Sequence, residues 1–176
     1  MIQKILEQDA RITQRLRVAE KPGLLRRMAI LLAHSGDSWF WLLVLILLAW
    51  LGAEFWSRRA LVFIVSILIT ALLVFVIKLT VRRRRPQGEW GQIYRKTDPH
   101  SFPSGHAARA ALLAVLAIGL GPAWLGLLLA VWSPLVMLAR VAMGVHYLSD
   151  VLAGALLGIL VGLAVLSLTP LLVTLA

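Results

Sequence analysis

Three short polar segments of the sequence carry side chains that could do chemistry on a phosphate ester. They are residues 78–86 (KLTVRRRRP), 103–106 (PSGH) and 140–150 (RVAMGVHYLSD), and long apolar stretches lie next to them. Together they hold arginines, a lysine, two histidines and an aspartate. Fixed cations bind anions, and the planar fork of arginine suits phosphate oxygens, so the segments predict a phosphate site.

The anion-binding part of this site is predicted from residues of all three segments. Lys78, Arg85 and Arg140 supply fixed positive charge. Gly105 lets the backbone approach an anion closely, and Ser104 adds a hydroxyl. If a helix begins at this point, its free N–H groups also face the anion.

The histidines predict the catalytic groups. His146 and Asp150 are four residues apart, so on a helix they share a face. Asp150 can then accept the Nδ1–H of His146 and leave Nε2 free to attack phosphorus. His106 is free to protonate the leaving oxygen. Arg109, one turn later, either adds a cation to the phosphate pocket or reaches out to a lipid headgroup.

The composition places these residues in a membrane protein. The chain has 176 residues, of which 60% are hydrophobic, and its mean hydropathy is +0.87. Its net charge of +10 lies beside apolar stretches, which favours anionic lipid headgroups over nucleic acid as partner. The absence of cysteine excludes thiolate chemistry and disulfides. The charged first 20 residues lack the apolar core of a cleavable signal peptide.

The apolar pattern predicts an all-α, polytopic membrane helix bundle with five to six transmembrane helices. Residues 110–139 carry no charge, and such a helix would be about 45 Å long, too long for one span. The turn signal at 119–122 divides this stretch in two. The expected spans are Ser38–Ala53, Ala60–Ile77, Ala107–Leu120, Ala123–Met143 and Val151 to about Leu168, where Pro170 ends or bends the last. This hairpin brings all three polar segments to one membrane face.

The first 37 residues form a separate region in this prediction. Residues 2–17 predict an amphipathic helix on the membrane surface, and residues 24–33 a short apolar helix. We therefore divide the chain into amphipathic interfacial helices, 1–37, and a transmembrane domain that carries the phosphate site, 38–176.

The three segments, in this order, resemble the type-2 phosphatidic acid phosphatase family, which belongs to one superfamily with the vanadium haloperoxidases. The family pattern is K-x6-R-P, then P-S-G-H, then S-R-x5-H-x3-D, and it covers residues 78–150 here. One departure is Ala139, which stands where the family has serine. We expect this change to tune the site rather than inactivate it.

The resemblance implies a lipid phosphate phosphatase. By it, His146 forms a phosphohistidine, His106 protonates the departing lipid alcohol, and the cations with Ser104 and Gly105 hold the phosphoryl oxygens. No metal or other cofactor is implied. The acidic residues agree independently, because only Asp150 of the eight lies inside a segment and a two-metal site needs clustered carboxylates. Phosphatidic acid, phosphatidylglycerol phosphate and polyprenyl mono- or diphosphates all fit as substrates.

Several alternatives remain open at this stage. The same site would serve a lipid phosphotransferase, and a non-catalytic protein that binds anionic lipids would need no histidines. All lysines and arginines except Arg58 and Arg59 fall on the motif face, which predicts a cytoplasmic site in the cell membrane. The family resemblance points to the outer face, and the oligomeric state is open.

Residues outside the motifs receive ordinary structural roles. Arg82, Arg83 and Arg84 are interpreted as interfacial anchors, and His34 and His100 as structural histidines. Trp90 and Tyr94 are aromatic residues that could line a lipid entrance.

Overall fold

The computed structural model describes residues 2–19, 21–88 and 98–174. In these ranges the named elements are all helices, which confirms the all-α fold class. They are α1 (Ile2–Leu16), α2 (Leu24–Ser35), α3 (Ser38–Leu51), α4 (Glu54–Val81), α6 (Gly105–Leu120), α7 (Ala123–Ala142) and α8 (Leu148–Thr174).

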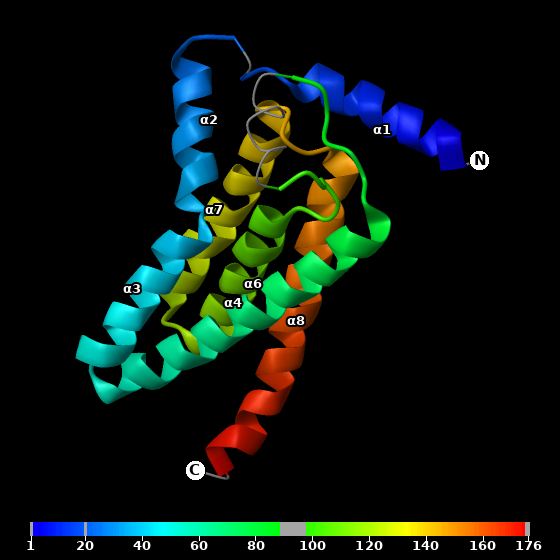
Figure 1. Cartoon of the computed structure of the whole chain (residues 1–176). Helices are drawn as coiled ribbons and strands as arrows, with labels where there is room; N and C mark the ends of the chain where they lie inside the picture. Colours follow the sequence, from blue (N-terminus) through cyan, green and yellow to red (C-terminus); the bar gives the residue numbers. More distant parts are fainter. Residues whose placement is uncertain (1, 20, 89–97, 175–176) are drawn as a thin grey trace.

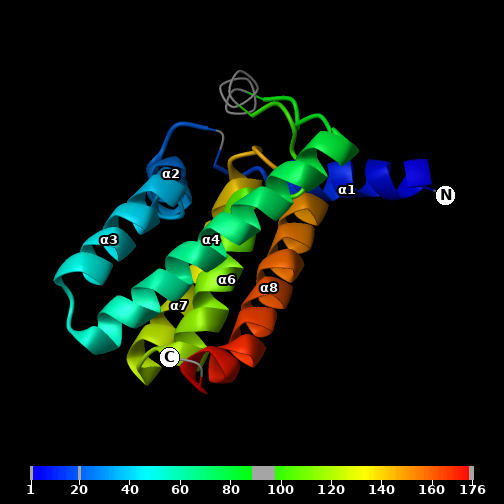
Figure 2. The ribbon, with the colours of Figure 1, turned by 60° about the horizontal axis from the view of Figure 1, so that its bottom comes forward.

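The helices form a bundle around α6 (Figures 1 and 2). α6 packs against α7, α8 and α4, while α3 packs on α4 and α2 packs on α7. α1 lies across one end of the bundle, near the loops that join the other helices. The C-terminus lies at the opposite end. The predicted amphipathic helix therefore lies across the end of the bundle that carries the polar segments.

The predicted hairpin between residues 107 and 143 is confirmed. α6 ends at Leu120 and α7 begins at Ala123, because Gly121 closes the first helix with a 2.9 Å bond from its N–H to the Ala117 carbonyl. Pro122 has no N–H to continue that helix. The start of α6 and the end of α7 thus lie at the same end of the bundle. Pro170 does not end α8, which continues to Thr174.

Three helices are long and apolar enough to cross a membrane, judged by length and composition over the described residues. They are α4, α7 and residues Leu148–Thr169 of α8. α2 and α3 meet the same criterion only as a pair, joined at a 48° bend, and α6 is a shorter apolar helix. The helix predicted over residues 24–33 is therefore α2, the first of the two helices in this bent pair. The break between the two helices, Gly36–Asp37, lies beside α6, as the contacts below show.

Glycines on α8 allow an unusually close approach to α6. A Cβ atom on Gly158 would lie 2.0 Å from the carbonyl oxygen of Ala108, and one on Gly154 would lie 2.3 Å from that of Ser104. Small residues at such spacing let membrane helices approach at backbone distance. The first turns of α6, which carry His106, are held in place by this contact.

Replacing Gly158 by valine is expected to push α6 and α8 apart, because the backbone of α6 cannot yield as a flexible side chain would. Overpacking of this kind costs about 1–3 kcal/mol, which corresponds to a fall of about 2–12 °C in the melting temperature. Thermal unfolding in detergent measures it. Leu156→Ile, on the exposed face of the same helix, is the matched control and should leave the melting temperature unchanged. A Gly158→Val protein as stable as the parent would contradict the packing.

Candidate active site

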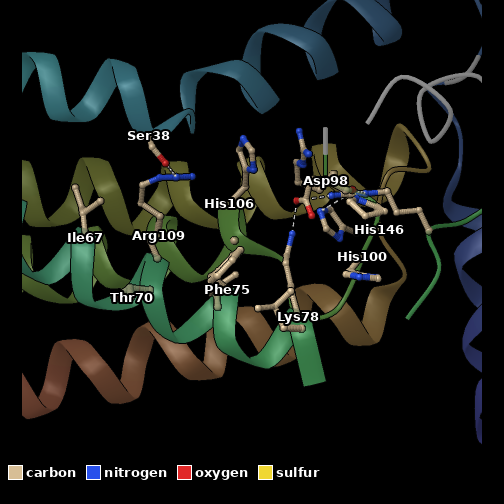
Figure 3. A pocket seen from close by; sticks show the side chains of 17 residues that line it. Ser38, Ile67, Thr70, Phe75, Lys78, Asp98, His100, His106, Arg109 and His146 are labelled. Atoms are coloured by element: carbon tan, nitrogen blue, oxygen red, sulfur yellow. Dashed lines mark hydrogen bonds and ion pairs between the residues drawn. The ribbon is translucent and has the colours of Figure 1, made fainter. Parts of the chain in front are cut away.

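The three polar segments meet at one cavity of about 440 Å³ (Figure 3). Its polar end lies between the last turn of α4, the start of α6 and the end of α7. From there it continues along the apolar face of α4, past Val74 and Thr70 to Ile67. Seven of the predicted site residues line it: Lys78, Arg85, Gly105, His106, Arg109, Arg140 and His146.

Backbone pairing aligns the first segment with the residues before the second. Arg84 and His100 form an isolated antiparallel bridge, and the N–H of Ser101 donates to the Arg83 carbonyl at 2.8 Å. This pairing sets Arg85 beside Asp98 and brings Ser101 beneath His146. It is a long-range contact that the spacing of the motif residues does not reveal.

Three buried cations form the polar end of the cavity. Lys78, Arg85 and Arg140 are 8%, 3% and 1% exposed. Asp98 lies among them: its carboxylate accepts hydrogen bonds from Lys78 Nζ and, at 2.8 Å, from Arg85 Nη2. Burial alone would raise the pKa of the Asp98 carboxyl, but the bond and charge of Lys78 and the charge of Arg85 hold that pKa below its usual value. The ionised carboxylate therefore occupies the position in which these cations would hold a phosphoryl oxygen.

Replacing Asp98 by asparagine is expected to tighten phosphate binding, because a bound phosphoryl group must displace the carboxylate from Lys78 and Arg85. We expect KM for the substrate and Ki for orthovanadate to fall by about 3- to 10-fold, since charge-assisted bonds are roughly twice as strong as neutral ones. Steady-state kinetics with vanadate inhibition measures both constants. Glu54→Gln, at the far end of α4, is the control. Unchanged or weaker binding would show that Asp98 does not compete with phosphate.

His146 is positioned at the edge of this cation cluster. Its Nδ1 lies 2.8 Å from the Ser101 carbonyl, and a carbonyl only accepts, so Nδ1 carries the proton. Its Nε2 is then the unprotonated nitrogen, 3.2 Å from Arg85 Nη1. Burial lowers the pKa of His146 well below its ordinary value, and the charges of Arg85, Arg140 and Lys78 lower it further. The imidazole is therefore neutral near pH 7, with a lone pair on Nε2.

The expected hydrogen bond from His146 to Asp150 is wrong. The nearer carboxylate oxygen of Asp150 is 3.7 Å from Nδ1, and the Ser101 carbonyl takes the proton instead. The reason is competition, because Asp150 accepts bonds from Arg83 Nη1 at 2.7 Å and from the Tyr147 N–H at 2.9 Å. Asp150 therefore lies in the first turn of α8 next to the loop that carries His146, and its carboxylate is engaged by Arg83 and by the backbone of that loop.

Arg83 is a site residue that the sequence interpretation missed. It was assigned as a lipid anchor, but it is half-buried and bridges Asp150 to Asp9 of α1, each at 2.7 Å. Its guanidinium also lies over the Tyr147 ring, 3.9 Å from the centroid. Asp9 further accepts the Ser149 N–H at 3.1 Å, so α1 is bonded to the start of α8. No signal in the RRRR run separates Arg83 from its neighbours.

The second histidine faces the break between α2 and α3. His106 Nε2 lies 2.7 Å from an Asp37 carboxylate oxygen, a partner for which the sequence gave no signal. Arg109 lines the cavity, as expected of a cation in the phosphate pocket, and it also makes contacts that the sequence did not predict. Its Nε donates to the Gly36 carbonyl at 3.2 Å and its Nη1 to the Ser38 hydroxyl, so it fastens the break onto α6 while lining the cavity.

Two other motif positions have packing roles. Ser104 is fully buried and is not among the residues that line the cavity, and its hydroxyl accepts the Ala107 N–H at 3.4 Å as the cap of α6. Ala139, where the family pattern has serine, packs in an apolar cluster with Ala29 and Ala33 of α2. The methyl group of Ala139 thus forms part of the contact between α7 and α2.

The remaining sequence predictions concern His100, His34, Trp90 and Tyr94. His100, assigned a structural role, lines the cavity beside Asp98. His34, also assigned a structural role, contacts Asp37. Trp90 and Tyr94 lie outside the residues that the structure describes. Over the described ranges, no three acidic, histidine or cysteine side chains are grouped to hold a metal ion.

Comparison with known proteins adds independent findings. Residues 59–173 match the family model of the PAP2 superfamily. The chain is 35% identical over 149 residues to the decaprenylphosphoryl-5-phosphoribose phosphatase of Mycobacterium tuberculosis, covering 82% of this chain and 80% of the relative. It is 31% identical over 137 residues to the undecaprenyl-diphosphatase of Sulfolobus acidocaldarius, covering 76% of this chain and 66% of that one.

Two crystal structures resemble the fold. The transmembrane PAP2-type phosphatidylglycerolphosphate phosphatase of Bacillus subtilis matches with a TM-score of 0.78 at 25% identity, over 95% of this chain and 87% of that one. LpxE of Aquifex aeolicus matches with a TM-score of 0.69 at 24% identity, over 88% and 93%. The latter likeness concerns the fold alone.

Proposed function

Because the chain belongs to the PAP2 superfamily, we propose that it is an integral-membrane lipid phosphate phosphatase that works through a phosphohistidine. One observation carries the proposal: the unprotonated Nε2 of a neutral His146 lies at the edge of a cluster of three buried cations. A nucleophile beside an anion pocket is the arrangement that phosphoryl transfer requires.

The chemistry follows from the positions of the groups. Lys78, Arg85 and Arg140 hold the phosphoryl oxygens and offset the charge that builds on them in the transition state. Nε2 of His146 attacks phosphorus, the bond to the lipid oxygen breaks, and His106 gives that oxygen a proton. Water then attacks the phosphohistidine, His106 takes a proton from it, and phosphate leaves with His146 restored. Each turnover thus returns both histidines to their starting states.

We propose a lipid with a terminal phosphate as the substrate, and a polyprenyl-linked phosphate as the first to test. The cavity begins at the cations and continues along the apolar face of α4, which suits a phosphate on a lipid anchor. Both curated relatives described above are named for polyprenyl-linked substrates. The cell membrane is the proposed location.

A substrate panel tests the proposal. Purified protein in detergent is incubated in EDTA with phosphatidic acid, phosphatidylglycerol phosphate, a polyprenyl diphosphate and a polyprenyl phosphoryl-phosphoribose, and released phosphate is measured. We expect metal-independent release, fastest from a polyprenyl lipid. No release from any lipid would overturn the proposal. Transfer of labelled phosphate to added glycerol instead of water would identify a phosphotransferase with the same site.

A further inference from the structure

We propose that Asp37, at the break between α2 and α3, is the positioning residue of the general acid His106. It orients the imidazole and stabilises its protonated form. The inference rests on the proposed function, since it assigns a partner to the proton donor of that reaction. Asp37 lies outside the three sequence motifs and outside the family-model match.

The carboxylate of Asp37 contacts the imidazole of His106 directly. One carboxylate oxygen lies 2.7 Å from His106 Nε2, and the other accepts from Trp39 Nε1 at 3.3 Å and lies 3.0 Å from His34 Nδ1. With Nε2–H donated to Asp37, Nδ1 is the ring nitrogen left to face a leaving oxygen. The described residues give that Nδ1 no hydrogen-bond partner of its own.

Helix capping does not explain the aspartate at position 37. Asp37 is the N-cap residue of α3, where aspartate, asparagine and serine are preferred because their side chains accept a bond from the helix N-terminus. Its side chain makes no such bond here. The carboxylate is turned toward His106 instead, and Arg109 fixes this arrangement by bonding Gly36 and Ser38 on both sides of it.

The charges around His106 explain why it needs a carboxylate. Burial of the ring disfavours a protonated imidazole most, and the positive charges of Arg140 of α7 and Arg109 of α6 disfavour it further. Asp37 is the carboxylate that opposes them, and His34 shares it from the more exposed side. A general acid must hold its proton until the leaving oxygen takes it. The carboxylate therefore keeps the proton available in a pocket built to attract anions.

The substitution Asp37→Asn tests the inference, because asparagine keeps the size and the N-cap preference and loses only the charge. On a lipid phosphate, whose alkoxide leaves poorly without a proton, kcat should fall about 10- to 100-fold. On 4-nitrophenyl phosphate, whose phenolate leaves unaided, kcat should stay within about 3-fold. The high-pH limb of the lipid kcat profile should move to lower pH, because imidazolium without its counter-ion loses its proton earlier.

Matched variants separate positioning from structure. Trp39→Phe removes another partner of Asp37 and should change neither the substrate ratio nor the pH profile, while Asp37→Glu should restore part of the lipid activity. Equal losses of kcat on both substrates with an unmoved pH profile would mean that Asp37 has a structural role, and would overturn the inference. An Asp37→Asn enzyme with the kcat values and the pH profile of the parent would overturn it as well. If the parent itself releases no phosphate from any lipid, the proposed function fails instead.

Discussion

Replacing His146 by alanine is expected to abolish turnover, lowering kcat by at least about 10⁴-fold. Two other imidazoles, His106 and His100, line the cavity with the cationic and carboxylate groups, but His106 is turned toward Asp37 and His146 is the histidine whose unprotonated Nε2 lies 3.2 Å from Arg85 Nη1. Loss of a nucleophile that forms a covalent intermediate removes the whole two-step path. Phosphate release from the lipid substrate measures the effect.

Trapping experiments distinguish a lost nucleophile from a lost fold. The parent enzyme, quenched in alkali during turnover of a labelled lipid phosphate, should carry label that acid removes, as expected of a phosphorus–nitrogen bond. The alanine variant should carry none, while its melting temperature stays close to that of the parent. His100→Ala, a cavity histidine without an assigned step, is the control and should still be labelled. Label retained by His146→Ala would contradict the assignment of the nucleophile.

The sequence predicts most of the elements and the location of the site. Hydropathy locates the helices because membrane spans must satisfy their backbone internally, and the excess length of residues 110–139 requires a turn near Gly121. Once that hairpin is drawn, the three polar segments fall at one end of the bundle. The cavity found there contains seven of the predicted residues.

The sequence does not predict which partners the site residues take. Asp37, at a bend between two helices, meets His106, and Arg83 meets Asp150 through a side-chain ion pair. Both contacts join residues more than 60 positions apart, so no periodicity within one helix encodes them. The i,i+4 argument for His146 and Asp150 fails for a related reason. His146 lies in the loop before α8, where helix spacing does not apply.

The substitution Arg85→Gln is expected to separate two roles of one cation, phosphate binding and control of the nucleophile. Arg85 donates to Asp98 on one side, where substrate oxygens would bind, and faces His146 Nε2 on the other. Removing a cation that stabilises the charge of the transition state costs about 10²–10³-fold in kcat/KM. Arg84→Gln is the control, because that side chain is exposed and its backbone bridge to His100 survives the change.

The pH profile of Arg85→Gln tests directly whether Arg85 controls the protonation of His146. After burial, the charge of Arg85 is the largest cause that holds the pKa of His146 below its ordinary value, so its removal raises that pKa. The low-pH limb of kcat/KM, where Nε2 gains a proton and can no longer attack, should therefore move to higher pH. A loss of rate without this movement would mean that Arg85 binds phosphate but does not govern His146. A movement in the opposite direction would mean that the titrating group is not the nucleophile.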